Sequence, residues 1–455
     1  MLIHSASQLL TLSGGPQRGQ ELGRLGMIPD GAVLIRDGLI AEIGSSDELR
    51  QRYPDEEMLD AGGKVVMPGF VDPHTHLIWA GDRAAEFEMR LEGKTYLEIL
   101  AAGGGILSTV RASRNAGVAE LVRQTRNRAR DLLAHGTTTA EVKTGYGLDW
   151  QGELDELQAI LALDAEGPLE LVPTYLGAHA IAPEFKGNPQ GYTDLLCNDL
   201  LPRTRQWWLE HAGERPLPFV DVFCETGAFD LAQSRQILTK AKELGFPLKI
   251  HADEFDNLGG ASLAVELGAA SADHLVKTSA ADIAALGGSE TVAVALPPTP
   301  FGLADPHYTP AKAILQAGGY LAVASDINPG TAWCGNMQFV IALACRYLKL
   351  TPAQAIAAAT INAAQAIRRA DTIGSIEPGK SADLVARDLL DPAMDYGTIE
   401  KFASRDYGAA FYWNGAAMRS RVGSRYLLIG SSACSTWATA LSNAPWAVPT
   451  PKEAT

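Results

Sequence analysis

The fold is indicated first by one stretch, Val65-Val-Met-Pro-Gly-Phe-Val-Asp-Pro-His-Thr-His76. Residues 65–71 are apolar or small, which predicts a buried β-strand, and two histidines follow where that strand would end. Amphipathic segments typical of helices, such as residues 118–134 and 231–244, separate further runs of this kind. These further runs lie at residues 137–142, 169–176, 219–224, 247–250, 270–275, 291–296 and 320–324. Strands that alternate with helices over about 300 residues predict an α/β protein with a parallel (β/α)8 barrel.

The same alternation of strands and helices also fits an open, doubly wound α/β sheet. Its dinucleotide-binding form needs a G-x-G-x-x-G motif directly after a strand, and the chain has none there. Gly103-Gly-Gly105 precedes a helix-like segment but lacks the Lys-Ser/Thr pair of a phosphate-binding loop. The barrel is therefore favoured.

The two ends of the chain predict short strands of a different kind. Residues 31–44 hold two apolar runs joined at Asp37-Gly38, which is typical of a β-hairpin. Residues 382–386 and 411–415 are short apolar runs of the same kind, with a second turn at Asn414-Gly415. The simplest account is one small β domain to which both ends contribute.

These patterns divide the chain into three parts. We expect a small β-sandwich domain built from residues 1–65 and 371–425, and a catalytic barrel at residues 66–370. Residues 426–455 form a tail that carries no charge from Tyr426 to Pro451 and whose structure the sequence does not indicate. Its many Ser, Thr, Asn and Pro residues argue against a membrane-spanning helix.

Charge and cysteine usage restrict the partners. The net charge is −15, from 38 basic and 53 acidic side chains, so neither nucleic acid nor a membrane surface is an expected partner. A small anionic substrate remains compatible, because a pocket needs only one or two local cations. Five scattered cysteines without a C-x-x-C pair, and no signal-peptide pattern, predict a cytoplasmic protein. A local run of arginines is expected on a solvated helix face: Arg111, Arg114, Arg123, Arg126, Arg128 and Arg130.

Histidines recur where the predicted strands end. Five of the nine histidines do so: His74, His76, His179, His251 and His274. A single histidine of this kind is more often a hydrogen-bonded core or loop residue. A barrel, however, gathers the carboxyl ends of its strands on one face, which is where active sites are found.

Four of the side chains at these ends have the chemistry of a metal site. His74 and His76 are two residues apart, so on an extended segment both imidazoles point to the same side. His251 at the fifth strand adds a third nitrogen, and Asp326 after the eighth strand adds an oxygen. Three nitrogens and a carboxylate describe an open catalytic site for zinc or a similar divalent metal. Without the histidines, Asp326 would equally suit a turn or a helix N-cap.

Several motifs resemble the amidohydrolase superfamily: the H-x-H after the first strand, His251, His274, Asp326 and the closing Gly379-Lys-Ser-Ala-Asp-Leu-Val385. Within it, the chain resembles the imidazolonepropionase family from about residue 60 to 390. The segments specific to that family include Glu141-Val-Lys-Thr-Gly-Tyr-Gly-Leu-Asp149 and Tyr175-Leu-Gly-Ala-His-Ala180. The other matching segments are Val71-Asp-Pro-His-Thr-His-Leu-Ile-Trp-Ala-Gly-Asp-Arg83, Gly103-Gly-Gly-Ile-Leu-Ser-Thr-Val-Arg-Ala112, His251-Ala-Asp-Glu254 and Ser325-Asp-Ile-Asn-Pro-Gly-Thr331.

The resemblance implies a metal, zinc or iron, bound by His74, His76, His251 and Asp326. It also implies hydrolysis of 4-imidazolone-5-propanoate to N-formimidoyl-L-glutamate, and a homodimer. Two-metal relatives need a bridging carbamylated lysine after the fourth strand, where residues 220–226 have neither lysine nor histidine. One divalent metal per subunit is therefore expected.

The resemblance also assigns the substrate-binding residues. Arg83 is expected to pair with the substrate carboxylate, although by itself it reads as a surface arginine. Tyr146 and His179 offer neutral hydrogen bonds, or serve packing and loop anchoring instead. The turn after Asp326 is expected to hold the new carboxylate of the product, or to be a plain turn; its residues are Asn328, Gly330 and Thr331.

Three residues are expected to carry the chemistry. His274 orients the water or polarises the ring carbonyl, and Asp326 takes the proton of the water. Glu254, three residues after His251, contacts the ring nitrogens and delivers a proton to the leaving nitrogen, unless it is a solvated loop residue. The rival readings are a deaminase of the cytosine or guanine type, which does not need the set Arg83, Tyr146 and His179, and a non-catalytic scaffold, which would have lost metal ligands.

Overall fold

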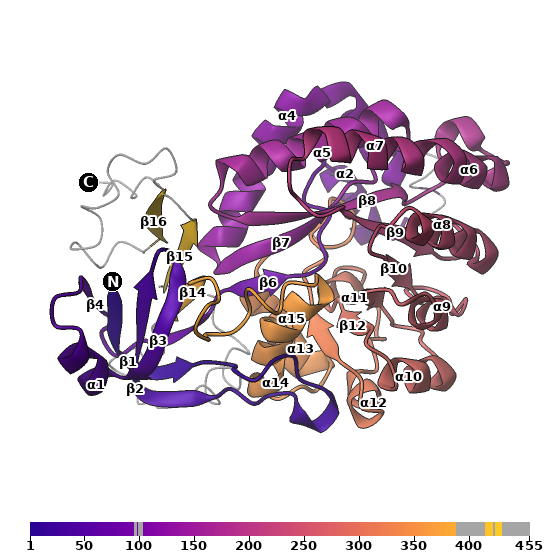
Figure 1. Ribbon diagram of the computed structural model, residues 1–455. Helices are drawn as coiled ribbons and strands as arrows, with labels where there is room; N and C mark the ends of the chain where they lie inside the picture. Colours follow the sequence, from indigo (N-terminus) through magenta and orange to yellow (C-terminus); the bar gives the residue numbers. More distant parts are fainter. Residues whose placement is uncertain (95–97, 99–102, 388–414, 422–423, 430–455) are drawn as a thin grey trace.

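The computed structural model describes residues 1–94, 98, 103–387, 415–421 and 424–429. Within them, eight parallel strands form a barrel in the order β6 to β13, each paired with the next along the chain. The barrel with its surrounding helices confirms the predicted fold class, and Figure 1 shows the helices outside the strands. The barrel strands are β6 (Phe70–Asp72), β7 (Thr137–Lys143), β8 (Glu170–Ala178), β9 (Phe219–Cys224), β10 (Lys249–Ala252), β11 (Ser271–His274), β12 (Val292–Ala295) and β13 (Leu321–Val323).

The first apolar run is not one strand, and the prediction of a single strand over residues 65–71 is wrong. It divides into β5 (Val65–Pro68), which belongs to a separate sheet, and β6 of the barrel. Gly69 lies at the division, where a side chain would collide with Thr138 of the neighbouring strand β7. The Gly69 N–H donates to the carbonyl of Asp383 at 2.8 Å, which ties the division to the C-terminal part of the chain.

Side chains and loops close the barrel between its first and last strands. The Ser325 N–H donates to Asp72 Oδ1 at 3.0 Å. The Asp326 N–H donates to the carbonyl of His74 at 3.1 Å, and the His76 N–H donates to the carbonyl of Ile327 at 2.9 Å. These bonds bring the segment after β6 directly beside the segment after β13.

The helices pack around the strands, and polar caps fix where several begin. Asp149 accepts a hydrogen bond from the Gly152 N–H at the start of α5, and Asp230 forms a capping box with Gln233 at the start of α8. The helix expected at residues 118–134 begins earlier, since α4 starts at Ile106 and bends at Gly117. The helices after β6 are α2 (Ala84–Leu91), α4 (Ile106–Ala134), α5 (Trp150–Glu166), α6 (Pro189–Leu195), α7 (Leu201–His211), α8 (Leu231–Glu243), α9 (Gly260–Leu267), α10 (Ala280–Gly287), α11 (Pro298–Gly302), α12 (Ala311–Gln316), α13 (Met337–Tyr347), α14 (Pro352–Ala358) and α15 (Ile361–Ala366).

Strands from both ends of the chain form a second, mixed sheet beside the barrel (Figure 1). Its order is β16-β15-β14-β5-β1-β2-β3, with β4 paired to β1. The hairpin expected at residues 31–44 is the antiparallel pair β2–β3. Its members are β1 (Leu2–Leu10), β2 (Met27–Arg36), β3 (Leu39–Ser45), β4 (Met58–Asp60), β5, β14 (Leu384–Arg387), β15 (Gly415–Arg421) and β16 (Ser424–Ile429), with helix α1 (Ser46–Arg52) after β3.

The run expected at 411–415 and the tail expected at 426–455 lie mostly outside the described residues. Residues 426–429, which the sequence pattern assigned to the tail, belong to strand β16 of the mixed sheet. Among the helices that are described, none is long and apolar enough to cross a membrane.

Candidate active site

Four predicted ligands converge at the carboxyl ends of the barrel strands. His74 and His76 follow β6, His251 lies in β10 and Asp326 follows β13. Asp326 Oδ1 lies 3.5 Å from Nε2 of both His74 and His76, and Nε2 of His251 lies 3.3 Å from Nε2 of His76. All four side chains are buried. Residues separated by up to about 250 positions in the sequence are thus brought within ligand distance of one another.

The polar atoms at this point of convergence suit a cation. Within the described part of the chain, His74 Nε2 and Asp326 Oδ1 have no hydrogen-bond partner although both are buried. Burial lowers the pKa of His74 and His76 well below the usual value for histidine, so both imidazoles are neutral and carry a lone pair. Neutral imidazole nitrogens and a carboxylate oxygen are ligands that zinc and similar divalent metals prefer. The residues present therefore fit a divalent metal.

Two buried carboxylates orient the histidines from behind. Asp273 Oδ2 lies 2.6 Å from His74 Nδ1, and Asp221 Oδ2 lies 3.0 Å from His251 Nδ1. The His74 contact is a hydrogen bond, and a ring that donates from Nδ1 keeps its lone pair on Nε2, the atom that faces the other ligands. The His251 contact is a close charge contact on the same side of its ring. The sequence analysis missed both aspartates. Their signal was an acidic residue inside a buried strand, Asp221 in β9 and Asp273 in β11.

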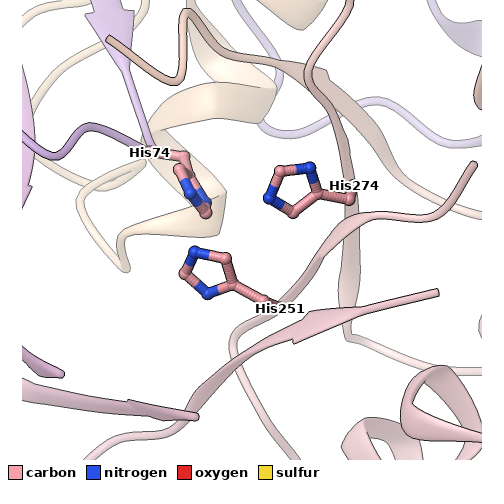
Figure 2. Close-up of side chains that lie close together, drawn as sticks. All are labelled: His74, His251 and His274. Atoms are coloured by element: carbon pink, nitrogen blue, oxygen red, sulfur yellow. The ribbon is translucent and has the colours of Figure 1, made fainter. Parts of the chain in front are cut away.

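A third histidine ring faces His74 and His251. Figure 2 shows the imidazoles of His74, His251 and His274 turned toward one another from three separate segments, and the ring centroid of His274 lies 5.4 Å from that of His74. His274 has a left-handed backbone conformation, with φ of 78°, and Asp326 has φ of 52°. Such conformations are unfavourable for residues with side chains and are concentrated at functional sites. His274 thus lies beside the candidate ligands His74 and His251.

Asp326 and Glu254 are two carboxyl groups in different surroundings. Asp326 Oδ2 accepts a hydrogen bond from the hydroxyl of Thr299, a residue that the sequence analysis missed. Burial raises the pKa of Asp326 to about 6, and the Thr299 hydroxyl opposes that rise. Glu254 lies 3.6 Å from His274 Nε2. Burial raises its pKa well above the usual range, and the charges of Asp326 and Glu225 raise it further.

Tyr146 and His179 lie beside the ligand His76. The His179 ring stacks on the His76 ring with centroids 4.7 Å apart, and the Tyr146 ring is 6.1 Å from that of His76. Burial lowers the pKa of His179 to about 3 and raises that of Tyr146, so both side chains stay neutral. Glu156 fixes the loop by accepting hydrogen bonds from the N–H groups of Gly145 and Tyr146 at 2.9 and 3.3 Å.

Arg83 is mostly buried and is not a surface arginine. Its Nε and Nη2 donate to Glu86 Oε2 at 3.0 and 2.7 Å, which fixes the guanidinium. Nη1 has no hydrogen-bond partner among the described residues and lies against Gly330, where an added Cβ would come within 2.6 Å of it. Only glycine at position 330 lets the turn approach Arg83 this closely.

The turn after Asp326 is built around Asn328. Asn328 Oδ1 accepts hydrogen bonds from the N–H groups of Gly330 and Thr331 at 2.7 and 2.8 Å, and its Nδ2 donates to the carbonyl of Asp326 at 2.7 Å. These contacts fix the turn beside Asp326. They also occupy the N–H groups of Gly330 and Thr331, which were expected to hold the new carboxylate of the product.

One of the arginines expected on a solvated face, Arg128, is half-buried instead. Arg128 donates to the carbonyls of Leu77 and Trp79 at 2.9 and 2.7 Å, and its guanidinium lies 3.6 Å from the centre of the Trp79 ring. Burial lowers the pKa of Arg128 to about 9. Arg128 therefore pairs with carbonyls of the segment after His76, and the prediction of a fully solvated side chain does not hold for this residue.

Comparison with known proteins agrees with this geometry. Residues 225–411 and 57–102 match models of the amidohydrolase family, and residues 31–55 match a model described as an imidazolonepropionase-like composite domain of bacteria. An imidazolonepropionase of Herpetosiphon aurantiacus is 51% identical over 391 residues, which cover 86% of this chain and 91% of the relative.

Solved structures share the fold at low identity. A guanine deaminase of E. coli has a TM-score of 0.67 at 18% identity and covers 88% of this chain and 93% of its own. A zinc-bound adenosine deaminase from Xanthomonas campestris has a TM-score of 0.61 at 19% identity and covers 86% of this chain and 85% of its own. These likenesses concern the fold alone, whereas the sequence similarity favours the lactam-hydrolysing family over the deaminase alternative.

Proposed function

The chain belongs to the imidazolonepropionase family of amidohydrolases, and from this premise we propose that it hydrolyses 4-imidazolone-5-propanoate to N-formimidoyl-L-glutamate. The observation that carries the proposal is the convergence of His74, His76, His251 and Asp326 on one buried point. The same convergence argues against a non-catalytic scaffold, because all four ligand positions are filled.

We assign to His74, His76, His251 and Asp326 the binding of one divalent metal, zinc or iron. A divalent metal at this point supplies a Lewis acid that lowers the pKa of a coordinated water and polarises a carbonyl group. The single-ion assignment is supported by Lys143, which lies in β7 between carboxylates and whose pKa is raised by Asp221 and Glu141 against the effect of burial. A protonated amine does not form the carbamate that bridges two metals. Metal analysis is expected to give one equivalent per subunit.

The side chains around the ligands support a hydrolytic reaction. Asp326, with a pKa of about 6, is ionised at neutral pH and accepts the proton of the attacking water. His274 donates to the ring carbonyl oxygen as that oxygen gains negative charge. Glu254, whose pKa is raised, is protonated and gives its proton to the ring nitrogen as the C–N bond breaks. Water thus supplies hydroxide to carbon and a proton to nitrogen overall.

The remaining residues select the substrate. We assign recognition of the propanoate tail to Arg83, with Glu86 holding its orientation, and hydrogen bonds to the substrate to Tyr146 and His179. Glu254 contacts the ring nitrogens. Asn328, Gly330 and Thr331 form the wall beside Asp326 and Arg83. Because the N–H groups of Gly330 and Thr331 already donate to Asn328 Oδ1, we assign to these residues the shape of the wall and not a hydrogen bond to the new carboxylate of the product. A homodimer and a cytoplasmic location remain predictions; the latter is supported by free thiols at Cys197, Cys224, Cys334 and Cys345.

One assay tests the proposed function directly. Purified protein is incubated with 4-imidazolone-5-propanoate, and loss of the ultraviolet absorbance of the ring is followed with and without a chelator. We expect turnover that the chelator abolishes and that added zinc or ferrous ion restores, while guanine and cytosine are not deaminated. Deamination of either base without hydrolysis of the imidazolone would establish the rival function.

Replacement of Arg83 by methionine tests recognition of the tail. Methionine keeps the apolar stem but removes the guanidinium, so we expect KM for the imidazolone propanoate to rise roughly 10–100-fold, the loss of a charge-assisted hydrogen bond. A ring analogue that carries a methyl group in place of the propanoate is the control, and its kcat/KM is expected to change little. Equal losses for both substrates would show that Arg83 does not bind the tail.

A further inference from the structure

Two lysines are completely buried behind the histidine ligands. Lys143 in β7 and Lys249 in β10 both have an exposed fraction of 0%. Lys143 Nζ lies 2.7 Å from Glu141 Oε1, 2.8 Å from Asp221 Oδ2 and 3.9 Å from Asp273 Oδ2. A buried ammonium is unfavourable unless carboxylates and hydrogen bonds surround it, and these three carboxylates do so.

The carboxylates around Lys143 are the ones that orient the ligands. Asp221 Oδ2 contacts both Lys143 Nζ and His251 Nδ1, the latter at 3.0 Å. Asp273 Oδ2 contacts His74 Nδ1 at 2.6 Å and faces Lys143 as well. A single carboxylate oxygen therefore lies between Lys143 Nζ and the ring of each of two ligands, His251 and His74, which come from different strands.

Lys249 has a different set of partners. Its Nζ lies 3.4 Å from Asp273 Oδ2 and donates to Ser271 Oγ at 2.6 Å and to the carbonyl of Pro73 at 3.2 Å. No contact between Lys249 and Asp221 occurs among the described residues. The two lysines are thus similar in burial and charge but differ in whether they reach the carboxylate behind His251.

We propose that Lys143 is a positioning residue for the metal: its ammonium, 2.8 Å from Asp221 Oδ2, holds that carboxylate in place, and Asp221 holds His251 with Nε2 directed at the ion. Without the ammonium, Asp221 and Glu141 lie in a buried region and repel one another, so the hold of Asp221 on the His251 ring weakens, whereas Asp273 keeps the Lys249 ammonium 3.4 Å away. The inference rests on the metal-binding role proposed above. It does not depend on which substrate the loaded protein hydrolyses.

Zinc affinity in a double-mutant cycle tests the proposal. The dissociation constant for zinc is measured by competition with a chromophoric chelator for the wild-type chain, Lys143→Met, Asp221→Asn and the double variant. We expect each single change to weaken zinc binding about 10–100-fold, as found when partners of metal-bound histidines are removed. Because Lys143 acts through Asp221, the double variant should bind zinc within a few-fold of Asp221→Asn.

Lys249→Met is the matched control. It removes an equally buried side chain that does not touch Asp221. The fold-losses in zinc affinity caused by Lys249→Met and by Asp221→Asn should therefore multiply when the two changes are combined. Unchanged zinc affinity in Lys143→Met, or losses that multiply in the Lys143→Met/Asp221→Asn pair, would overturn the proposal. If Lys143→Met does not fold, the zinc affinity of the Lys143→Met/Asp221→Asn double variant, in which the two charge changes cancel, is compared with that of Asp221→Asn. If this double variant also fails to fold, Lys143 serves folding and the proposal is overturned. A wild-type chain that binds zinc tightly but leaves the imidazolone intact refutes the proposed function and leaves this cycle decisive for Lys143.

Discussion

Replacement of Asp326 by asparagine is expected to lower kcat for the imidazolone about 10²–10⁴-fold, the range for loss of a general base. Asparagine has nearly the same shape but no negative charge, so it neither accepts a proton from water nor serves as an anionic ligand. The metal content of the variant should fall as well, because Asp326 Oδ1 lies 3.5 Å from Nε2 of both His74 and His76. Steady-state kinetics with added zinc, together with metal analysis, separates the two losses.

Thr299→Val is the control for this experiment. It removes the hydroxyl that donates to Asp326 Oδ2 but leaves the carboxylate in place. We expect a smaller loss of kcat, about tenfold, which corresponds to one hydrogen bond to a charged group. An Asp326→Asn variant that keeps full turnover with zinc present would remove Asp326 from the chemistry and leave it at most a structural ligand.

Much of the fold follows from periodicity, because barrel strands are buried on both faces and are therefore continuously apolar. The boundaries depend on local collisions that periodicity does not record. Residues 65–71 look like one strand, yet they divide between two sheets at Gly69, the position where a side chain would collide with Thr138. Likewise, the arginine run around residue 128 looks amphipathic, and only the tertiary structure reveals the carbonyls of Leu77 and Trp79 that Arg128 covers.

The candidate metal ligands were predictable because their residue type and position at strand ends coincide. The groups behind them were not, because a charged residue inside an apolar strand has no periodic signature. Asp221, Asp273 and Lys143 each interrupt a buried strand, and what they do depends on neighbours from other strands. The turn at Asn328 is the reverse case. Its residues were identified from the sequence, but the sequence could not tell whether their N–H groups donate to a ligand or to a side chain of the turn itself.

The two carboxyl groups of the site both have raised pKa values but lie in different surroundings. Asp326 has a hydroxyl donor and a pKa of about 6, whereas Glu254 has a pKa raised well above the usual range by burial and by the charges of Asp326 and Glu225. Where two carboxyl groups have such different surroundings, one can serve as the proton acceptor and the other as the proton donor. Glu254 is the donor in this division, and its replacement therefore has a definite signature in the pH profile.

Glu254→Gln is expected to lower kcat about 10²–10⁴-fold, the range for loss of a general acid. In the wild-type chain Glu254 acts while protonated, so activity should fall as the pH rises through its raised pKa. Glutamine has no proton to lose, and the profile of the variant should lack this alkaline fall. Measurement of kcat against pH distinguishes loss of a proton donor from a general distortion of the site, which would lower the whole profile without changing its shape.

Glu225→Gln provides a matched change at the neighbouring carboxylate. Glu225 accepts hydrogen bonds from the N–H groups of Phe255 and Asp256, and its charge contributes to the raised pKa of Glu254. Neutral glutamine removes that contribution, so the pKa of Glu254 should fall and the alkaline limb should move to lower pH while the maximal rate is largely kept. An alkaline limb that persists in Glu254→Gln, or that stays fixed in Glu225→Gln, would assign the limb to another group. Loss of the alkaline limb in Glu254→Gln, together with its shift to lower pH in Glu225→Gln, would assign the limb to Glu254.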